Sequence, residues 1–166
     1  MAEQNGLRVK QKGFSLIELL IVVAIILIIA AIAIPNLIKS KMAANEASAV
    51  GSTRTVNTGE VNYSAMCPAT GYSVSLIELN TGALCAGGKG IIDPVLAAGA
   101  KSGYTFKYAA VVGADGLNDT YTIASTPSTV GTTGQRQFCS DQTGVIRYNL
   151  AGAGCVPGVG GSPALQ

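Results

Sequence analysis

A single carboxylate, Glu18, stands inside an otherwise apolar segment of this 166-residue chain. From Phe14 to Ile34 the only polar residues are Ser15 and Glu18. A glutamate so placed can accept a hydrogen bond from a free backbone N–H, as in the Ser-x-x-Glu capping box at a helix start. It can also pair with a cation, and one would arise on the amine of Phe14 if the chain were cut after Gly13.

An ion pair at Glu18 has the right size to set the register of packed helices. An amine and a carboxylate about 4 Å apart attract by about 4 kcal/mol at an effective dielectric near 20, before desolvation. Glu18 lies about 6 Å along a helix that begins at Phe14, so in a membrane it can stay near the headgroups. It then avoids most of the ~2.5 to 3.5 kcal/mol cost of a charge at the bilayer centre. Capping and ion pairing both remain open for this residue.

Four cysteines follow the apolar segment: Cys67, Cys85, Cys139 and Cys155. They show no C-x-x-C spacing and the chain has no histidine, so we expect no metal site and no cofactor. An even number after an export-like segment indicates disulfides formed outside the cytoplasm. Three pairings are possible. We favour Cys67 with Cys85 and Cys139 with Cys155, because each closes a short loop and could contribute about 3 kcal/mol.

Residue types elsewhere argue against catalysis and against nucleic-acid binding. Without histidine, the common triads and proton shuttles are excluded, and no G-x-S-x-G or phosphate-binding glycine pattern occurs. The adjacent pairs Ser40-Lys41 and Lys101-Ser102 are interpreted as ordinary surface residues. Beyond residue 13 the formal charge is zero and the Lys and Arg residues are scattered. We therefore expect neither an enzyme nor a nucleic-acid partner.

One loop offers oxygen ligands, from Asp115, Asn118 and Asp119. Its spacing does not fit an EF-hand, so a solvated turn is favoured over a calcium site, although calcium remains open. Asn118 and Asn62 each begin a formal N-glycosylation sequon, a short pattern that often arises by chance.

The apolar segment 14–34 has the dimensions of a membrane span. Its 21 residues make a helix about 31 Å long, close to the roughly 30 Å of bilayer hydrocarbon. More positive charges precede it than follow it, which favours a cytoplasmic N-terminus: Arg8, Lys10 and Lys12 against Lys39 and Lys41. A secretory signal peptide is disfavoured, because the segment is too long and lacks an A-x-A cleavage pattern.

The stretch KGFSLIELLIVVAIILIIAAIAIPNLI closely resembles the N-terminus of type IV prepilins and of the pseudopilins of type II secretion. Four spaced features carry the resemblance: a basic leader ending in Gly13, then Phe14, Glu18 and Pro35. The resemblance implies that a prepilin peptidase cuts after Gly13 and that the Phe14 amine is N-methylated. It also implies that the apolar helices later form a filament core, where Glu18 neutralises the Phe14 amine of a neighbour.

Pro35 would end an isolated helix, but in pilin-like chains the helix continues through a kink there. The alanine-rich sequence up to Pro68 supports continuation, although Gly51 and Gly59 weaken it. We therefore predict a leader over 1–13 and a long helix over 14–66, with its assembly segment at 14–34. A globular head over 67–155 and a flexible tail over 156–166 follow.

The head has signals for short helices and for a sheet. Ser75 and Gly82 bracket one capped helix, and Asp93-Pro94 opens another. Segments 104–112, 120–126 and 144–149 are candidate strands, separated by turns at 115–116 and 141–144. In the first of them, alternate residues from Tyr104 to Val112 share one apolar face. The predicted fold is α+β, with a kinked helix packed against an antiparallel sheet of three to four strands, as in pilins.

These observations predict a non-enzymatic subunit of a type IV pilus. Its expected partners are further copies of the chain, a prepilin peptidase, the inner membrane and the pilus assembly machinery. The precursor would lie in the inner membrane with its N-terminus in the cytoplasm, and the assembled filament would be extracellular. The alternatives are a pseudopilin of type II secretion or a single-pass membrane-anchored protein whose extracellular part binds a ligand.

Overall fold

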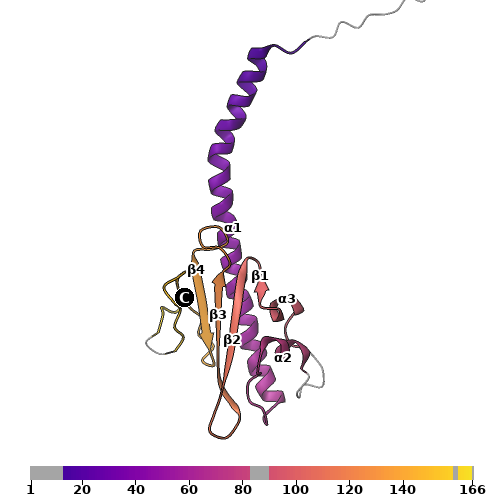
Figure 1. Ribbon diagram of the computed structural model, residues 1–166, viewed down its shortest axis with the longest axis vertical. Helices are drawn as coiled ribbons and strands as arrows, with labels where there is room; N and C mark the ends of the chain where they lie inside the picture. Colours follow the sequence, from indigo (N-terminus) through magenta and orange to yellow (C-terminus); the bar gives the residue numbers. More distant parts are fainter. Residues whose placement is uncertain (1–12, 83–89, 159–160, 166) are drawn as a thin grey trace, which may run out of the picture. The chain divides into compact units, whose positions relative to one another are not determined.

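A computed structural model describes residues 13–82, 90–158 and 161–165 of the chain (Figure 1). The chain divides into two units, Met1–Leu37 and Ile38–Gln166. The helix α1, Leu16–Met66, contributes to both, and its second half lies in the same unit as the sheet. The class is α+β, as predicted, with a long helix packed against an antiparallel sheet.

Pro35 lies inside α1, whose helical backbone continues on both sides of it. Proline lacks an N–H and therefore removes one hydrogen bond from the helix interior. The surrounding residues are mostly alanine, leucine and isoleucine, and the helix ends at Met66, where the sequence predicted its end. The kink expected at Pro35 remains a prediction.

The sheet has five strands in the order β1-β2-β3-β4-β5, and each neighbouring pair is antiparallel. The strands are β1 Ala100–Lys101, β2 Tyr104–Val112, β3 Asn118–Pro127, β4 Arg136–Asp141 and β5 Arg147–Leu150. Three to four strands were predicted, so the count was too low. β1 has only two residues, and β4 does not alternate because nearly all its residues are buried.

The turns between strands follow local chemistry. Ser102 and Gly103, both with positive φ (50° and 73°), form the two-residue connection between β1 and β2. At the β2–β3 turn, the Leu117 N–H donates to Asp115 Oδ1 at 3.0 Å. After β4, Asp141 Oδ1 accepts from the Thr143 N–H at 2.9 Å. Both aspartate turns lie where the sequence predicted them.

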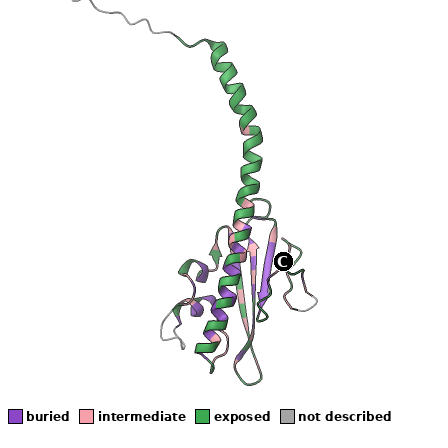
Figure 2. Cartoon of the chain, turned by 180° about the vertical axis from the view of Figure 1, so that it is seen from behind, coloured by how far each residue is buried: buried purple, intermediate pink, exposed green. Residues whose placement is uncertain are grey.

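The core lies between the second half of α1 and one face of the sheet (Figure 2). On the helix, Ala49, Val56 and Tyr63 recur every seven residues and are fully buried. From the sheet, the core includes Tyr104, Phe106, Tyr121, Ile123 and Phe138. The apolar face predicted for β2 is buried only in part, because Val112 at its far end is 62% exposed.

Glu46 ties the helix to the start of β4. Its carboxylate accepts from the backbone N–H groups of Gln135 (2.8 Å) and Arg136 (3.1 Å) and pairs with the Arg136 guanidinium at 2.8 Å. The same guanidinium lies over the rings of Phe138 and Tyr148. Burial alone would raise the pKa of Glu46, but these donors outweigh it and lower the pKa.

Glu60 is a second acid on the buried face of α1, and it is fully buried. It accepts from the Ser73 N–H (2.9 Å) and the Ser73 hydroxyl (2.5 Å). Because burial outweighs these neutral donors, the pKa of Glu60 is raised. One turn on, Tyr63 donates to Glu78 at 3.2 Å, and burial raises the pKa of Tyr63 to about 12. The hydrogen bonds of Glu60 with Ser73 and of Tyr63 with Glu78 thus hold the loop before α2, and α2 itself, against α1.

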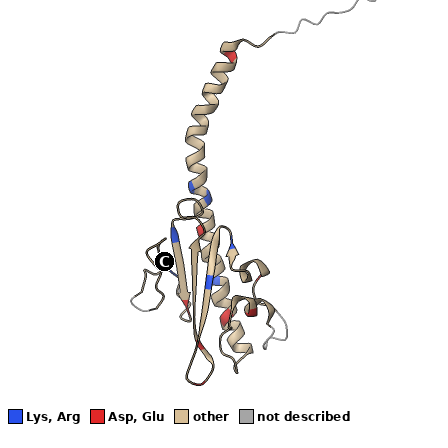
Figure 3. Cartoon of the chain, in the orientation of Figure 1, with Lys and Arg blue, Asp and Glu red and all other residues tan. Residues whose placement is uncertain are grey.

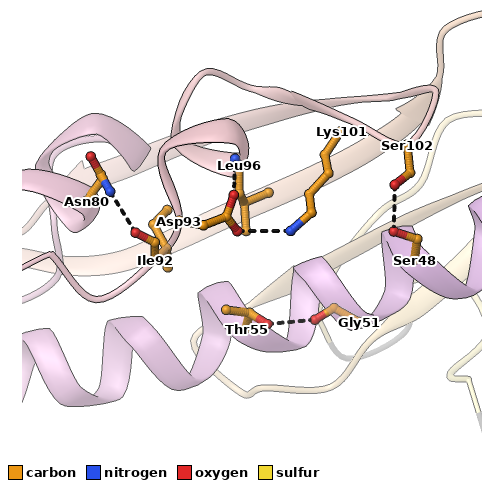
Figure 4. A network of polar contacts seen from close by, with 9 residues as sticks. All are labelled: Ser48, Gly51, Thr55, Asn80, Ile92, Asp93, Leu96, Lys101 and Ser102. Atoms are coloured by element: carbon orange, nitrogen blue, oxygen red, sulfur yellow. Dashed lines mark hydrogen bonds and ion pairs between the residues drawn. The ribbon is translucent and has the colours of Figure 1, made fainter.

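Two short helices lie beside the sheet, α2 Leu76–Thr81 and α3 Pro94–Ala97. Their predicted caps are present: Ser75 accepts from the Glu78 N–H (3.1 Å) and Asp93 from the Leu96 N–H (2.9 Å). Figure 4 shows the contacts that join this region. They are the Lys101–Asp93 ion pair at 2.9 Å and hydrogen bonds from Asn80 to the Ile92 carbonyl and from Ser48 to Ser102.

The C-terminal segment packs along β5. The Leu165 N–H donates to the Ile146 carbonyl and the Tyr148 N–H to the Pro163 carbonyl, at 2.8 and 2.9 Å. Leu165 also packs against the core. The sequence suggested a flexible tail because residues 156–166 are poor in core-forming side chains. Residues 161–165 nevertheless make backbone hydrogen bonds, which do not require such side chains, and the flexibility of the tail remains a prediction.

Cys139 and Cys155 form a disulfide that joins β4 to this C-terminal segment. Cys67 is buried and disulfide-bonded. Cys85, which we expect as its partner, lies outside the described residues, so that pairing remains a prediction.

Glu60→Gln should change the pH dependence of stability. In the folded state the pKa of Glu60 is raised above its ordinary value of 4.5 by burial. Its contribution is therefore fully present below that value and lost as pH rises through the raised pKa. The melting temperature of Glu60→Gln relative to wild type should increase between about pH 4 and pH 8.

Glu46→Gln is the matched control for this pH series. The pKa of Glu46 is lowered, so its contribution is present above 4.5 and lost in acid. The stability of Glu46→Gln should therefore fall furthest below that of wild type near neutral pH. Parallel pH profiles for the two variants would contradict the opposite assignments.

Replacing both Cys139 and Cys155 by alanine should destabilise the fold. The bridge spans 16 residues, a loop for which cross-linking contributes about 3 kcal/mol. Thermal unfolding of the full chain in detergent would measure the loss. An unchanged melting temperature would show that the contacts of residues 161–165 hold the segment without the bridge.

Candidate functional site

Gly13 and Phe14 immediately precede α1, and both are exposed. The Phe14 side chain is 83% exposed. A Cβ added at Gly13 would meet no atom within 4 Å, and its φ is not in the left-handed region. The chain's own structure therefore does not require glycine at position 13.

Glu18 caps the start of α1. Its Oε2 accepts a hydrogen bond from the Ser15 N–H at 2.9 Å, while the Ser15 carbonyl accepts from the Leu19 N–H at 3.2 Å. Ser15 thus occupies the N-cap position and Glu18 the third helical position, as in a capping box. The negative charge also lies at the positive end of the helix dipole.

The capping hydrogen bond leaves acceptor positions of the Glu18 carboxylate free to bind a cation. A carboxylate has about four acceptor positions, and the Ser15 N–H uses one of them. The group can therefore bind a cation without giving up its cap. The structure confirms the geometry of the capping hypothesis, and the ion-pair hypothesis is compatible with it.

The first half of α1 is apolar and exposed on every side (Figure 2). Its exposed large side chains between residues 14 and 34 are Phe14, Leu16, Ile17, Leu19, Leu20, Ile21, Val22, Val23, Ile25, Ile26, Leu27, Ile28, Ile29, Ile32 and Ile34. A helix that is apolar all round is stable only within a larger core or a membrane. Within the described residues, α1 is the one helix long and apolar enough to cross a membrane.

The calcium candidates are only partly brought together. The carboxylates of Asp115 and Asp119 both lie beside Gly113. Asn118 instead is buried, and its side-chain amide donates to the Tyr72 carbonyl at 2.8 Å. Over the described ranges, no three acidic, cysteine or histidine side chains form a group suited to a metal ion.

Other residues singled out in the sequence have structural partners. Lys101 pairs with Asp93, and Ser102 accepts from Ser48, so the adjacent Lys101 and Ser102 do not form a catalytic pair. Of the two sequons, Asn118 is buried whereas Asn62 is exposed on α1. Sequence reasoning missed the anchoring role of Glu46, because its partners in β4 lie about ninety residues away.

The described residues thus combine an exposed apolar helix half, which carries one acid at its start, with an α+β unit. A family model described as the prokaryotic N-terminal methylation motif matches residues 8–34. The type IV wide pilus major component PilA4 of Thermus thermophilus is 63% identical over 35 residues, or 21% of this chain.

That match spans 27% of the pilus component, so the chain matches about a quarter of its relative's length. No solved structure matches the chain significantly. The N-terminus of this chain therefore carries the methylation motif and sequence pattern of type IV pilins, and its long helix and antiparallel sheet form a pilin-like fold.

Glu18→Ala should loosen the first turn of α1. Loss of the cap should speed hydrogen exchange at the Ser15 amide by about two- to tenfold, the equivalent of roughly 0.5 to 1.4 kcal/mol. NMR of the full chain in detergent micelles would measure it. Ser15→Ala is the matched control, because it retains the backbone donor, and Glu18→Gln retains an acceptor. Equal exchange in all three variants would contradict the cap.

Proposed function

We propose that this chain is a structural subunit of a type IV pilus. It would be made as a membrane-anchored precursor, cut between Gly13 and Phe14, methylated on the Phe14 amine and polymerised through its apolar helix. The observation that carries the proposal is the methylation motif over residues 8–34, which coincides with an apolar helix half that the chain itself leaves unburied.

The processing site is supported by its accessibility. Gly13 and Phe14 lie exposed before the first helical turn, where a peptidase can reach a backbone that is not helical. Since no atom of the described residues crowds Gly13, a requirement for glycine there would come from the peptidase. Cleavage would convert the Phe14 nitrogen into an amine just before the helix start.

Glu18 would then form an ion pair with the Phe14 amine of a neighbouring subunit. An ion pair at about 4 Å contributes about 4 kcal/mol at an effective dielectric near 20, before desolvation. That is enough to favour one register between otherwise featureless apolar helices. The acid would act in positioning, and no catalytic role is assigned to any residue.

Location follows from the same segment. The basic residues Arg8, Lys10 and Lys12 favour a cytoplasmic N-terminus, and disulfide formation in the second unit favours an oxidising compartment. The precursor would lie in the inner membrane and the filament outside the cell. Its partners would be other subunits, the prepilin peptidase and the assembly machinery.

A pseudopilin of type II secretion shares this N-terminal pattern and is the second candidate. The name of the relative, a pilus component, favours the pilus. Filaments recovered by shearing intact cells would support the pilus, whereas a polymer confined to the periplasm would support the pseudopilin.

The sharpest test compares Glu18→Gln with Glu18→Ala. Both remove the charge, but glutamine can keep the hydrogen bond to Ser15. We expect both variants to insert in the membrane and to be processed, and both to lose sheared filaments by more than tenfold, the equivalent of about 1.4 kcal/mol.

Mass spectrometry of the same material checks processing. The mature wild-type protein should begin at N-methylated Phe14 and lack residues 1–13. A chain retaining Met1 to Gly13 in filaments would overturn the processing proposal. Normal filaments from Glu18→Gln would overturn the ion pair.

A further inference from the structure

Exposed acids in the second unit are confined to one hairpin. Of the seven carboxylates that residues 38–166 contain, five are buried or paired within the chain: Glu46, Glu60, Glu78, Asp93 and Asp141. The exposed two are Asp115, in the connection between β2 and β3, and Asp119, the second residue of β3. Figure 3 shows the acids of this hairpin in red. Among its Asp and Glu side chains, the unit thus presents exposed negative charge at a single place.

The hairpin directs both carboxylates to one side. A side chain built on Gly113 would lie 1.7 Å from Asp119 Oδ2 and 3.1 Å from Asp115 Oδ1. Beside them, Val111 and Val112 are 55% and 62% exposed. We name Val111, Val112, Asp115 and Asp119 the acidic hairpin. It joins apolar surface with two negative charges.

A matching surface lies at the other end of the same unit. Lys39 and Lys41 are exposed on α1, next to the exposed Ile38. We name Ile38, Lys39 and Lys41 the basic segment. From Lys41 to the end of α1 the helix runs about 38 Å. The β2–β3 hairpin lies at the end of the sheet far from the start of β4, which contacts Glu46 (Figure 1).

We propose that the acidic hairpin of one subunit binds the basic segment of a second copy, displaced by about one length of the second unit along the filament. The inference rests on the proposed polymerisation and specifies a contact within it. The carboxylates meet the ammonium group of either Lys39 or Lys41, which lie two residues apart and therefore on different sides of α1, and exposed valines meet an exposed isoleucine. Because the two surfaces lie at opposite ends, a chain cannot satisfy them alone, but a head-to-tail array can.

The contact is weak singly and sensitive to salt. Exposed ion pairs contribute little each, and they are screened within about 10 Å at moderate ionic strength. Repetition at every subunit makes the sum substantial, because each further contact forms within an assembled polymer. The filament should therefore lose cohesion as salt rises, independently of its apolar interior.

A zero-length cross-linker tests the contact directly on filaments of the full chain. A carbodiimide activates a carboxylate, a lysine amine displaces the resulting urea, and an amide forms with net loss of water. We expect peptides that join Asp115 or Asp119 to Lys39 or Lys41, identified by mass spectrometry. Cross-links from these acids to Lys107 or Lys101 would overturn the assignment.

Conservative variants provide the matched controls. Lys39→Arg with Lys41→Arg keeps both charges but removes the amines, so filaments should persist without the cross-link. Asp115→Asn with Asp119→Asn should remove the cross-link and lower the salt concentration at which filaments dissociate by about twofold or more. Unchanged salt resistance in the asparagine variant would overturn the proposal.

Charge exchange completes the test. Asp115→Lys with Asp119→Lys should reduce filament yield by about fivefold or more, and adding Lys39→Glu with Lys41→Glu should restore it. Failure of the fourfold variant to recover, or dissolution of wild-type filaments by a calcium chelator alone, would assign the hairpin another ligand. Wild-type filaments that lack the cross-link would refute this contact but leave the proposed function standing. Absence of any wild-type filament would refute the proposed function.

Discussion

The constraint on which the rest of this molecule depends is an apolar helix half that its own chain does not cover. Fifteen large apolar side chains between residues 14 and 34 stand about half exposed or more. Burying them would release roughly 20 kcal/mol, more than the net stability of most domains. The segment therefore needs an apolar surrounding, which in the proposed function would be lipid first and other helices later. A subunit with such a segment can change partners but cannot remain free in water.

Much of this was readable from the sequence because the evidence is local. The length and composition of segment 14–34, the caps at Ser75 and Asp93, and the turns at Asp115 and Asp141 all depend on neighbours a few residues away. The two-residue β1 and the fully buried β4 carry no such signal. The hydrogen bonds of residues 161–165 carry no such signal either, since backbone groups make them with partners at Ile146 and Tyr148 that the sequence does not name.

The second half of α1 shows a different limit of sequence reasoning. Its buried face includes Glu46, Asn57 and Glu60 as well as Ala49 and Val56, so only a thin apolar repeat at every seventh residue marks it. These polar groups are accommodated because the sheet and loops supply donors and acceptors, such as the Gln135 and Ser73 N–H groups and the Tyr121 hydroxyl, which donates to Asn57. Buried polar contacts specify one docking geometry, whereas the all-apolar first half accepts many.

That contrast explains why one acid at the helix start can matter. An apolar helix sliding along others meets similar surfaces at successive registers, so packing alone discriminates weakly. A carboxylate that already caps its own helix remains hydrogen-bonded in lipid and does not need to be unpaired before it meets a new cation. The cap would keep the cost of carrying the charge low, and in the proposed filament the charge would supply the register that the apolar side chains lack.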